Sequence, residues 1–359
     1  MRRPFFIFVA LLFIALVGFG YYKFFYQTQT GNNKVIRISQ IQGFESPHSV
    51  ARDKNGNLYV CDFVTNTVIV YDQNNLFVKE IGSSGGGNGQ FKKPHAVDFD
   101  QQGNLIVTDY GNKRVQKFDP AGTFISILQT PKKLNGPATS YFDQNYNLYV
   151  SDFDSSSVLK YSPELKFIGF VGMKTSGQLT SGWEINGDSQ KSTLAGGFDR
   201  VHSARVDEKG NVYVIDTWNH RVQRFSKEGK FTGWIGAKSD GTLTDGWQIS
   251  EEAVPTKQPG GFNAPIALDF AGQNELMVLE NQNPRIQLFS RKTGKFLGWF
   301  GAKDTGGIAE KWEKDGFARE GSDLGAISSS YDLKVYGNKV YIADTGNHRI
   351  QIIEFEKEF

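Results

Sequence analysis

The sequence is short of cysteine, of net charge and of histidine, and these shortages narrow the range of functions. Cys61 is the single cysteine, so no disulfide can form within the chain. It stands next to Asp62 inside an expected strand, where a small buried side chain fits better than a reactive thiol. The formal net charge is only +2, whereas nucleic-acid-binding proteins need a concentrated basic face. We therefore expect no nucleic-acid partner.

Only one stretch is long and free of charge, and it lies at the N-terminus. Two arginines precede an uncharged run from Pro4 to Tyr22. Eighteen residues of helix from Phe5 would span about 27 Å, close to the thickness of a bilayer core. The arginines favour a cytoplasmic N-terminus. The sequence therefore predicts a membrane anchor over residues 1–26, a polar tether over 27–34 and the remainder on the extracytoplasmic side, periplasmic or at the cell surface. A signal peptide is the alternative, although no Ala-x-Ala site ends the run.

A repeated pattern fills the rest of the chain, with 40 glycines and 14% aromatic residues suited to many tight turns between strands. Each copy has an expected strand, a turn, a second strand that ends in an acidic residue, a loop and a third strand. The acidic residue recurs six times, as Asp62, Asp109, Asp152, Asp216, Glu280 and Asp344. Regular copies of this kind indicate a propeller. We expect an all-β, six-bladed β-propeller over residues 35–359.

Two matching deficits predict how the ring closes. Residues 35–41 alternate as a strand does, yet they precede the first strand of blade one. The last blade stops after its third strand, near Phe355. We expect the N-terminal strand to complete blade six and so to remove an open sheet edge.

A short motif after the acidic residue carries a family resemblance. It occurs as Asn112-Lys113-Arg114, Asn219-His220-Arg221 and Asn347-His348-Arg349. It resembles the NHL-repeat family, and the resemblance extends over residues 35–359. Propellers of this family serve as binding platforms, receptors and enzymes. The recurring positions of each copy have an expected structural role, hydrogen bonding and ion pairing in the turn, at Asp62, Asp109, Asp216, Asp344, Arg114, Arg221 and Arg349.

Three of the five histidines occupy one repeat position, 14 residues before the acidic residue. They are His48, His95 and His202, and this position opens the innermost strand of a blade. Three imidazoles that converge on the axis would form a site for zinc or another divalent transition metal. The alternative is that each ring hydrogen-bonds the backbone of a neighbouring blade. Pro47-His48 and Pro94-His95 also resemble the peptidyl-α-hydroxyglycine amidating lyases, and that resemblance implies zinc at these positions.

Long aromatic inserts follow the fourth strands of blades three, four and five, and they end at Trp183, Trp247 and Trp312. In an up-and-down blade these inserts and the first residues of the inner strand lie on one face. The three tryptophans are therefore predicted to line the rim of a concave ligand site. Packing of the inserts against each other is the alternative.

Two functions remain open. The first is a binding or scaffold module that takes a protein, peptide or glycan on the insert-bearing face, since loops on a rigid frame commonly carry recognition residues. The second is a metal-dependent lyase or hydrolase centred on His48, His95 and His202.

Overall fold

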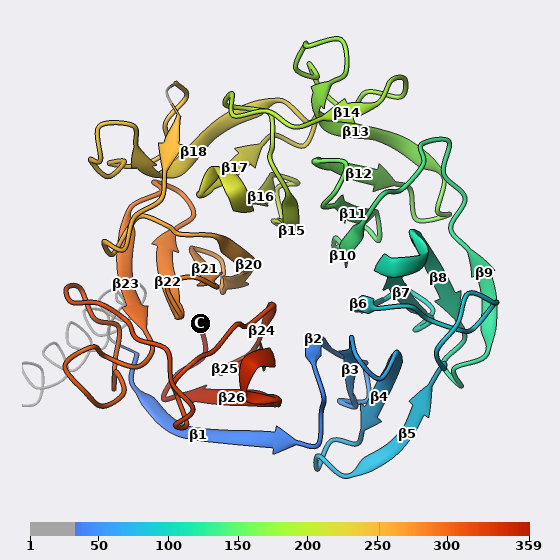
Figure 1. Ribbon diagram of the computed structural model, residues 1–359, viewed down its shortest axis with the longest axis horizontal. Coiled ribbons are helices and arrows are strands. Elements are labelled where there is room, and N and C mark those ends of the chain that lie inside the picture. Colours follow the sequence, from blue (N-terminus) through green and yellow to red (C-terminus); the bar gives the residue numbers. More distant parts are fainter. Residues whose placement is uncertain (1–32, 251) are drawn as a thin grey trace, which may run out of the picture.

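The computed structural model describes residues 33–250 and 252–359, and these residues form a six-bladed β-propeller. Six antiparallel sheets stand radially around one axis, as Figure 1 shows. The predicted all-β fold and the number of blades are both confirmed.

The blades follow one another along the chain, and in the first five the strands succeed one another from the channel outward. Blade one consists of β2 (Pro47–Arg52), β3 (Leu58–Asp62), β4 (Thr67–Tyr71) and β5 (Phe77–Ile81). Blade two consists of β6 (Pro94–Phe99), β7 (Leu105–Asp109), β8 (Arg114–Phe118) and β9 (Phe124–Ile127). Blade three consists of β10 (Pro137–Phe142), β11 (Leu148–Asp152), β12 (Ser157–Tyr161), β13 (Phe167–Lys174) and β14 (Ser189–Gln190).

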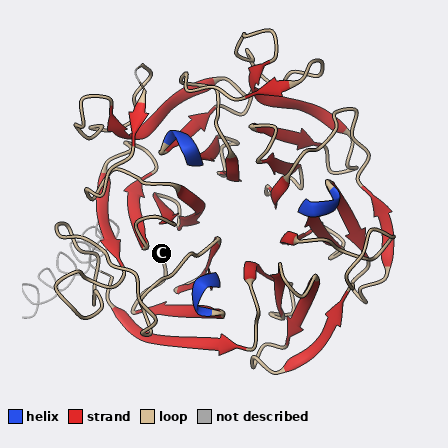
Figure 2. Cartoon of the chain, in the orientation of Figure 1, coloured by secondary structure: helices blue, strands red, loops and turns tan. Residues whose placement is uncertain are grey.

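Blade four consists of β15 (Val201–Val206), β16 (Val212–Asp216), β17 (Arg221–Phe225), β18 (Phe231–Lys238) and β19 (Ala253–Val254). Blade five consists of β20 (Pro265–Ala271), β21 (Glu275–Glu280), β22 (Arg285–Ser290) and β23 (Phe296–Phe300). Blade six consists of β24 (Asp332–Tyr336), β25 (Lys339–Asp344), β26 (Arg349–Phe355) and β1 (Val35–Gln42). Three short 3-10 helices, drawn blue in Figure 2, follow the second strands of blades two, four and six: η2 (Tyr110–Asn112), η3 (Thr217–Asn219) and η4 (Thr345–Asn347).

The hydrophobic core is divided among the six interfaces between neighbouring blades. One of its clusters, for example, joins Val68 and Val70 of blade one to Val97 and Val107 of blade two. Equivalent clusters fill the other five interfaces. Because both faces of each sheet are covered, the second strands β3, β7, β11 and β16 are buried along their whole length.

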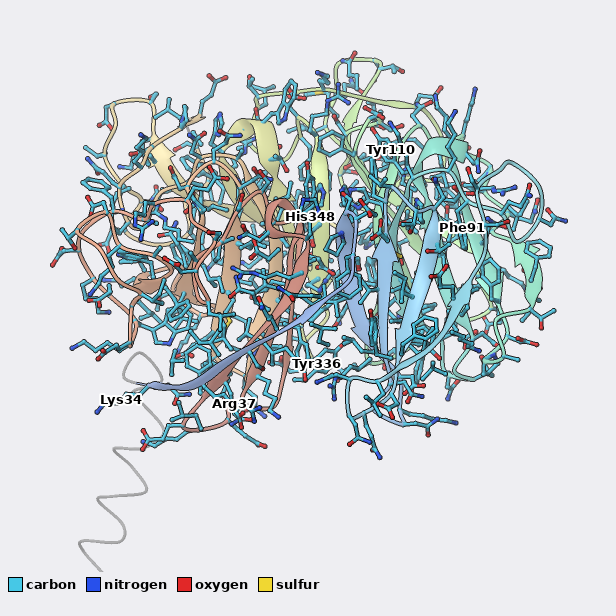
Figure 3. The ribbon with its side chains drawn as sticks, turned by 60° about the horizontal axis from the view of Figure 1, so that its bottom comes forward. Lys34, Arg37, Phe91, Tyr110, Tyr336 and His348 are labelled. Carbon is cyan, nitrogen blue, oxygen red and sulfur yellow. The ribbon has the colours of Figure 1, made fainter. Side chains whose placement is uncertain are left out.

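The ring closes as the two sequence deficits predict. Strand β1 pairs with β26 in antiparallel register, from Val35 opposite Phe355 to Gln42 opposite Arg349. The strand is one residue longer than expected. Figure 3 shows β1 rising along the outside of the ring from Lys34, and the sheet of blade six thereby gains its fourth strand.

The predicted anchor, residues 1–26, lies outside the described residues, as does most of the predicted tether. Within the described ranges, no helix is long and apolar enough to cross a membrane.

Candidate functional site at the channel mouth

His48, His95 and His202 lie together at the starts of the inner strands β2, β6 and β15. The ring centroids of His48 and His95 are 4.7 Å apart, and those of His95 and His202 are 4.9 Å apart. Blade three lies between blades two and four and has Ala138 at this position. The small alanine leaves room for His95 and His202 to meet across it.

A β-bulge explains why this position faces the axis. The register of β2 against β3 shifts between Pro47 and Ser49, so His48 has no opposite residue in the ladder. The same shift occurs at the equivalent position of blades two, three, four and five. A bulge bends the strand and redirects the extra side chain. The three imidazoles are therefore directed by a backbone irregularity that recurs in five of the six blades.

Aromatic rings surround the histidines. His48 is stacked between Phe63 and Tyr331, with centroid distances of 4.1 Å and 4.2 Å and nearly parallel planes. Phe153 meets His202 edge-on at 5.9 Å. This environment holds the rings and removes them from water.

Four buried imidazole nitrogens have no hydrogen-bond partner in the part of the chain that the structure describes. They are Nδ1 of His48, Nδ1 of His95 and both ring nitrogens of His202, although the backbone of Ile266 in the next blade is near enough to His202 to oppose the lowering of its pKa. Burial lowers the pKa of His95 to about 4. Burial, followed by the charges of the neighbouring histidines, lowers the pKa values of His48 and His202 well below their ordinary value. All three rings are therefore neutral at physiological pH, so each has one N–H donor and one nitrogen whose lone pair can accept a hydrogen bond or ligate a metal.

The three histidines are of the residue type that binds zinc, and two of the three ring pairs have the spacing expected of zinc ligands. Zinc binds neutral imidazole at about 2.0–2.1 Å, which places the centroids of two tetrahedral imidazole ligands about 5 Å apart. The observed 4.7 Å and 4.9 Å agree with that separation. As the side chains stand, however, no group of three or more His, Cys, Asp or Glu among residues 33–250 and 252–359 is arranged to hold a metal ion. The metal-ligating role of His48, His95 and His202 therefore stays a prediction.

A layer of buried charge follows the histidines along the inner strands. The guanidinium of Arg205, three residues after His202, is 1% exposed and lies 3.6 Å from Asp269 and 3.7 Å from Asp332. Asp332 in turn accepts hydrogen bonds from the Ser49 hydroxyl at 2.9 Å and the Val50 amide at 3.2 Å. Burial raises the pKa of a further carboxyl here, that of Asp98. The sequence analysis missed this layer, although a charged residue three positions after the histidine position recurs in blades two, four and five.

The structure places the three tryptophans away from the histidines. The Trp183 indole donates to the Lys227 carbonyl at 2.9 Å, and the Trp247 indole donates to the Arg291 carbonyl at 3.0 Å. Trp312 is 3% exposed and stacks on Phe355. All three side chains fill outer parts of blade interfaces, each against the next blade. Packing accounts for these contacts, and the ligand-binding role of the tryptophans stays a prediction.

The acidic residues of the repeat are the centres of buried hydrogen-bond networks. Asp216 accepts hydrogen bonds from Asn219, Arg221 and Gln223, at positions +3, +5 and +7, and the Nε of Arg221 lies 2.7 Å away. The same set surrounds Asp109, Glu280 and Asp344, with ion pairs to Arg114, Arg285 and Arg349. Asp62 has no arginine and accepts instead from the backbone amides of residues 45, 46, 64 and 65. These side chains hold turns in place and point into the protein.

Comparison with known proteins agrees with this architecture. Residues 44–71, 91–118 and 198–225 match the NHL repeat family. A segment of 109 residues is 30% identical to peptidyl-glycine alpha-amidating monooxygenase B of Xenopus laevis. That match covers 28% of this chain and 11% of the relative, so the chain spans only a small part of its length.

Solved structures share the fold along nearly the whole chain. Virginiamycin B lyase from Staphylococcus aureus, crystallised with quinupristin, is 9% identical with a TM-score of 0.55 and covers 89% of this chain and 99% of its own. A gluconolactonase from Xanthomonas campestris is 10% identical with a TM-score of 0.55, and the match covers 90% of this chain and 95% of the gluconolactonase. An auxiliary nutrient binding protein from Bacteroides ovatus is 17% identical with a TM-score of 0.57, and the match covers 91% of this chain and 78% of that protein. At such identities the similarity concerns the fold alone.

Proposed function

We propose that this NHL-repeat propeller is a membrane-tethered, extracytoplasmic binding module that takes its ligand at the channel mouth. The observation that carries the proposal is the convergence of His48, His95 and His202 with four buried ring nitrogens that have no partner among the described residues. A buried polar atom without a partner costs about 1–3 kcal/mol. A ligand that accepts a hydrogen bond from each ring N–H without a partner, and donates to each ring nitrogen that carries a lone pair, recovers that cost.

The surrounding rings favour a ligand with a flat or apolar part. Phe63 and Tyr331 already stack on His48, and aromatic side chains of this kind provide contact area at low entropic cost. A peptide or glycan that combines hydroxyl or amide groups with an apolar face matches both features.

The course of β1 supports a mouth that faces away from the membrane. In Figure 3, Lys34 and Arg37 lie toward the side of the ring that carries Tyr336, and Tyr110 and His348 lie toward the opposite side. The loops after the second strands, which include Tyr110, are on the side where the histidines begin the inner strands. A tether before residue 33 would therefore leave the propeller at the face opposite the mouth.

The test compares the stability of the full-length protein with that of His202→Ala and His48→Ala. A binding site is not optimised for stability, so we expect each variant to shift Tm by less than about 2 °C, the shift that roughly 1 kcal/mol produces in a domain of this size. The matched control is His220→Ala, because the Nδ1 of His220 accepts a hydrogen bond from the Ala264 amide at 3.1 Å and holds two blades together. A larger loss for His202→Ala than for His220→Ala would refute the proposal and assign the channel histidines to the framework.

The second candidate is a metal-dependent lyase or hydrolase at the same site. The spacing and neutral state of the three imidazoles favour it, and the similarity to the amidating monooxygenase of Xenopus laevis is in keeping with it. His48, His95 and His202 would hold the ion, which when bound would act as a Lewis acid. The aromatic rings around the site would exclude water from it.

Metal analysis separates the two candidates. Zinc at one equivalent per chain in the purified full-length protein, lost in His48→Ala and His202→Ala and retained in His220→Ala, would establish the metal-dependent candidate. Protein that takes up no zinc on dialysis against it, with unchanged stability in the first two variants, would leave the binding module.

A further inference from the structure

Three pairs of neighbouring blades are joined by a clamp near the start of a third strand. In five blades the residue before this strand has a left-handed backbone: Asn66, Lys113, Ser156, His220 and His348. In three of them its side chain accepts a hydrogen bond from a backbone amide of the next blade. Asn66 accepts from Lys93 at 2.7 Å, Ser156 from Arg200 at 3.1 Å and His220 from Ala264 at 3.1 Å.

Blade five cannot make this clamp, because the equivalent residue is Pro284. Proline has a fixed negative φ and no polar side chain. In blade six the residue equivalent to Lys93, Arg200 and Ala264 is Ser329, and it has the same left-handed backbone. Its backbone amide is the group that a clamp from blade five would hold. Nowhere in the described ranges does the Ser329 amide find a hydrogen-bond partner. A cavity of about 290 Å³ lies where the clamp is missing, with Pro284 and Ser329 in its lining.

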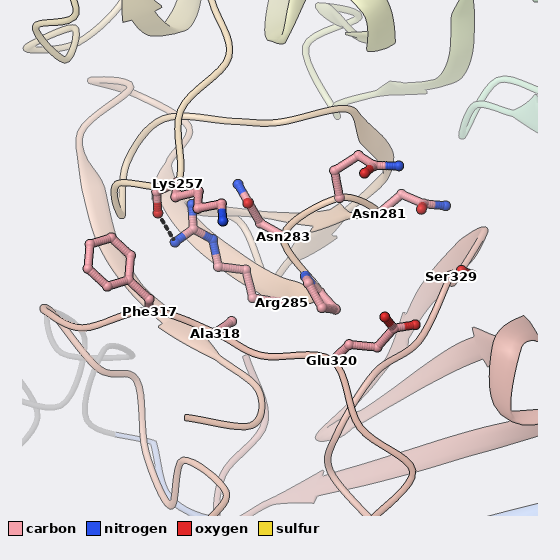
Figure 4. A pocket seen from close by; sticks show the side chains of 10 residues that line it. Lys257, Asn281, Asn283, Arg285, Phe317, Ala318, Glu320 and Ser329 are labelled. Carbon is pink, nitrogen blue, oxygen red and sulfur yellow. Dashed lines mark hydrogen bonds between the residues drawn. The ribbon is translucent and has the colours of Figure 1, made fainter. Parts of the chain in front are cut away.

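The lining of this cavity is mixed in charge and rich in amides, as Figure 4 shows. Lys257 and Glu320 contribute one charge of each sign, whereas the charge of Arg285 is neutralised by Glu280 at 2.6 Å. The side-chain amide of Asn281 donates one long hydrogen bond, at 3.4 Å, to the Ser330 carbonyl. Phe317 also lines the cavity, and its side chain is 45% exposed. The wall thus combines free donors, an acceptor and an accessible aromatic ring.

These features select among ligand classes. Glu320 disfavours an anion and Lys257 disfavours a cation, so a neutral ligand fits the charges best. The wall offers hydrogen-bond donors at Lys257 and the Ser329 backbone amide, an acceptor at Glu320, and both at the side-chain amide of Asn281. Hydroxyl groups suit such a wall because they both donate and accept hydrogen bonds. The volume is at the lower end of the range for ligand pockets, which excludes an extended peptide.

We propose that the cavity between blades five and six binds a single sugar unit of a saccharide, with Asn281, Lys257 and Glu320 bonding its hydroxyls and Phe317 stacking on its apolar face. The site shares no residue with the channel histidines. It therefore does not depend on the function proposed for them.

The experiment measures binding of glucose, galactose and N-acetylglucosamine to the full-length protein at millimolar concentration by saturation-transfer NMR. We expect at least one sugar to bind. Phe317→Ala removes the stacking contact and should weaken binding about three- to tenfold. Asn281→Ala should weaken it to a similar extent.

Pro284→His tests the origin of the cavity, since it restores the residue that clamps blades four and five. We expect this variant to lose sugar binding and to unfold at the same or a higher temperature. If it fails to fold, Phe317→Ala and Asn281→Ala still decide the matter, because Phe317 is 45% exposed and the Asn281 side chain makes only one long hydrogen bond, at 3.4 Å to the Ser330 carbonyl. The proposal is overturned if none of the three sugars binds or if the free amino acid alanine binds instead of them. It is also overturned if neither Phe317→Ala nor Asn281→Ala weakens the binding of a sugar.

Discussion

Replacing Arg221 by methionine leaves the Asp216 carboxylate without its cation inside the fourth blade. Both side chains are fully buried, and Arg221 donates to Asp216 at 2.7 Å, to the Leu194 carbonyl at 2.8 Å and to the Gly197 carbonyl at 3.1 Å. Removal of one partner of a buried ion pair costs about 3–5 kcal/mol. Asn219 and other donors still bond the carboxylate, so we expect a loss near the lower limit, about 3 kcal/mol.

The cost should also depend on pH. Burial raises the pKa of Asp216, and Arg221 opposes that rise. Without the arginine the folded-state pKa rises further above the unfolded value. Because the folded state then favours the protonated carboxyl, the variant loses stability as pH rises through the folded pKa. The difference from wild type should therefore be smaller in mild acid than at neutral pH.

The assay is urea denaturation followed by tryptophan fluorescence, with midpoints and slopes compared across variants. Arg114→Met in blade two is the matched control, because Arg114 makes the same ion pair at 2.8 Å but is 13% exposed. Water can reach that site, so its loss should be smaller than that of Arg221→Met. Equal losses at the two sites, or a loss below about 1 kcal/mol for Arg221→Met, would refute the assignment of a buried, charge-dependent network.

Three further predictions concern other parts of the ring. Burial raises the pKa of Glu275 from 4.5 to about 7, so the stability of the protein should fall as pH rises through that interval. Glu275→Gln should make thermal stability less dependent on pH and add up to about 3 kcal/mol of stability at higher pH. Glu310→Gln, at an exposed position, should have neither effect. Trp247→Phe removes the hydrogen bond to the Arg291 carbonyl and should cost about 1–2 kcal/mol in urea denaturation, and an unchanged midpoint would contradict the packing role. Deletion of residues 33–42 uncovers the edge of β26 and should produce oligomers in sedimentation analysis; a monomer with unchanged unfolding would show that ring closure is dispensable.

The repeat predicted the parts of the fold that each copy determines locally. The second strands, the acidic residues that end them and the closing strand could all be located, because each depends on residues within one blade or on two complementary deficits. The position of the three histidines could be predicted for the same reason, since one bulged position repeats in five blades.

Contacts between blades were harder to predict. The inserts that end at Trp183 and Trp247 bond to turns 44 residues further along the chain, and the repeat does not indicate how far a long loop folds outward. The charge layer around Arg205 draws its carboxylates from blades two, five and six. The cavity beside Pro284 lies where the clamp of blades one, three and four is missing, and this absence becomes visible only when those interfaces are known.

The pairing of β1 with β26 also means that the ring can close only at the end of chain synthesis. The two strands are roughly 300 positions apart in sequence, which a ribosome working at about 5–20 residues per second translates in about 15–60 s. Throughout that interval the first strand has been made and its partner has not. Four of its side chains are exposed, Ile36, Arg37, Gln40 and Gln42, and the three that are polar help the unpaired segment to stay soluble until the ring closes.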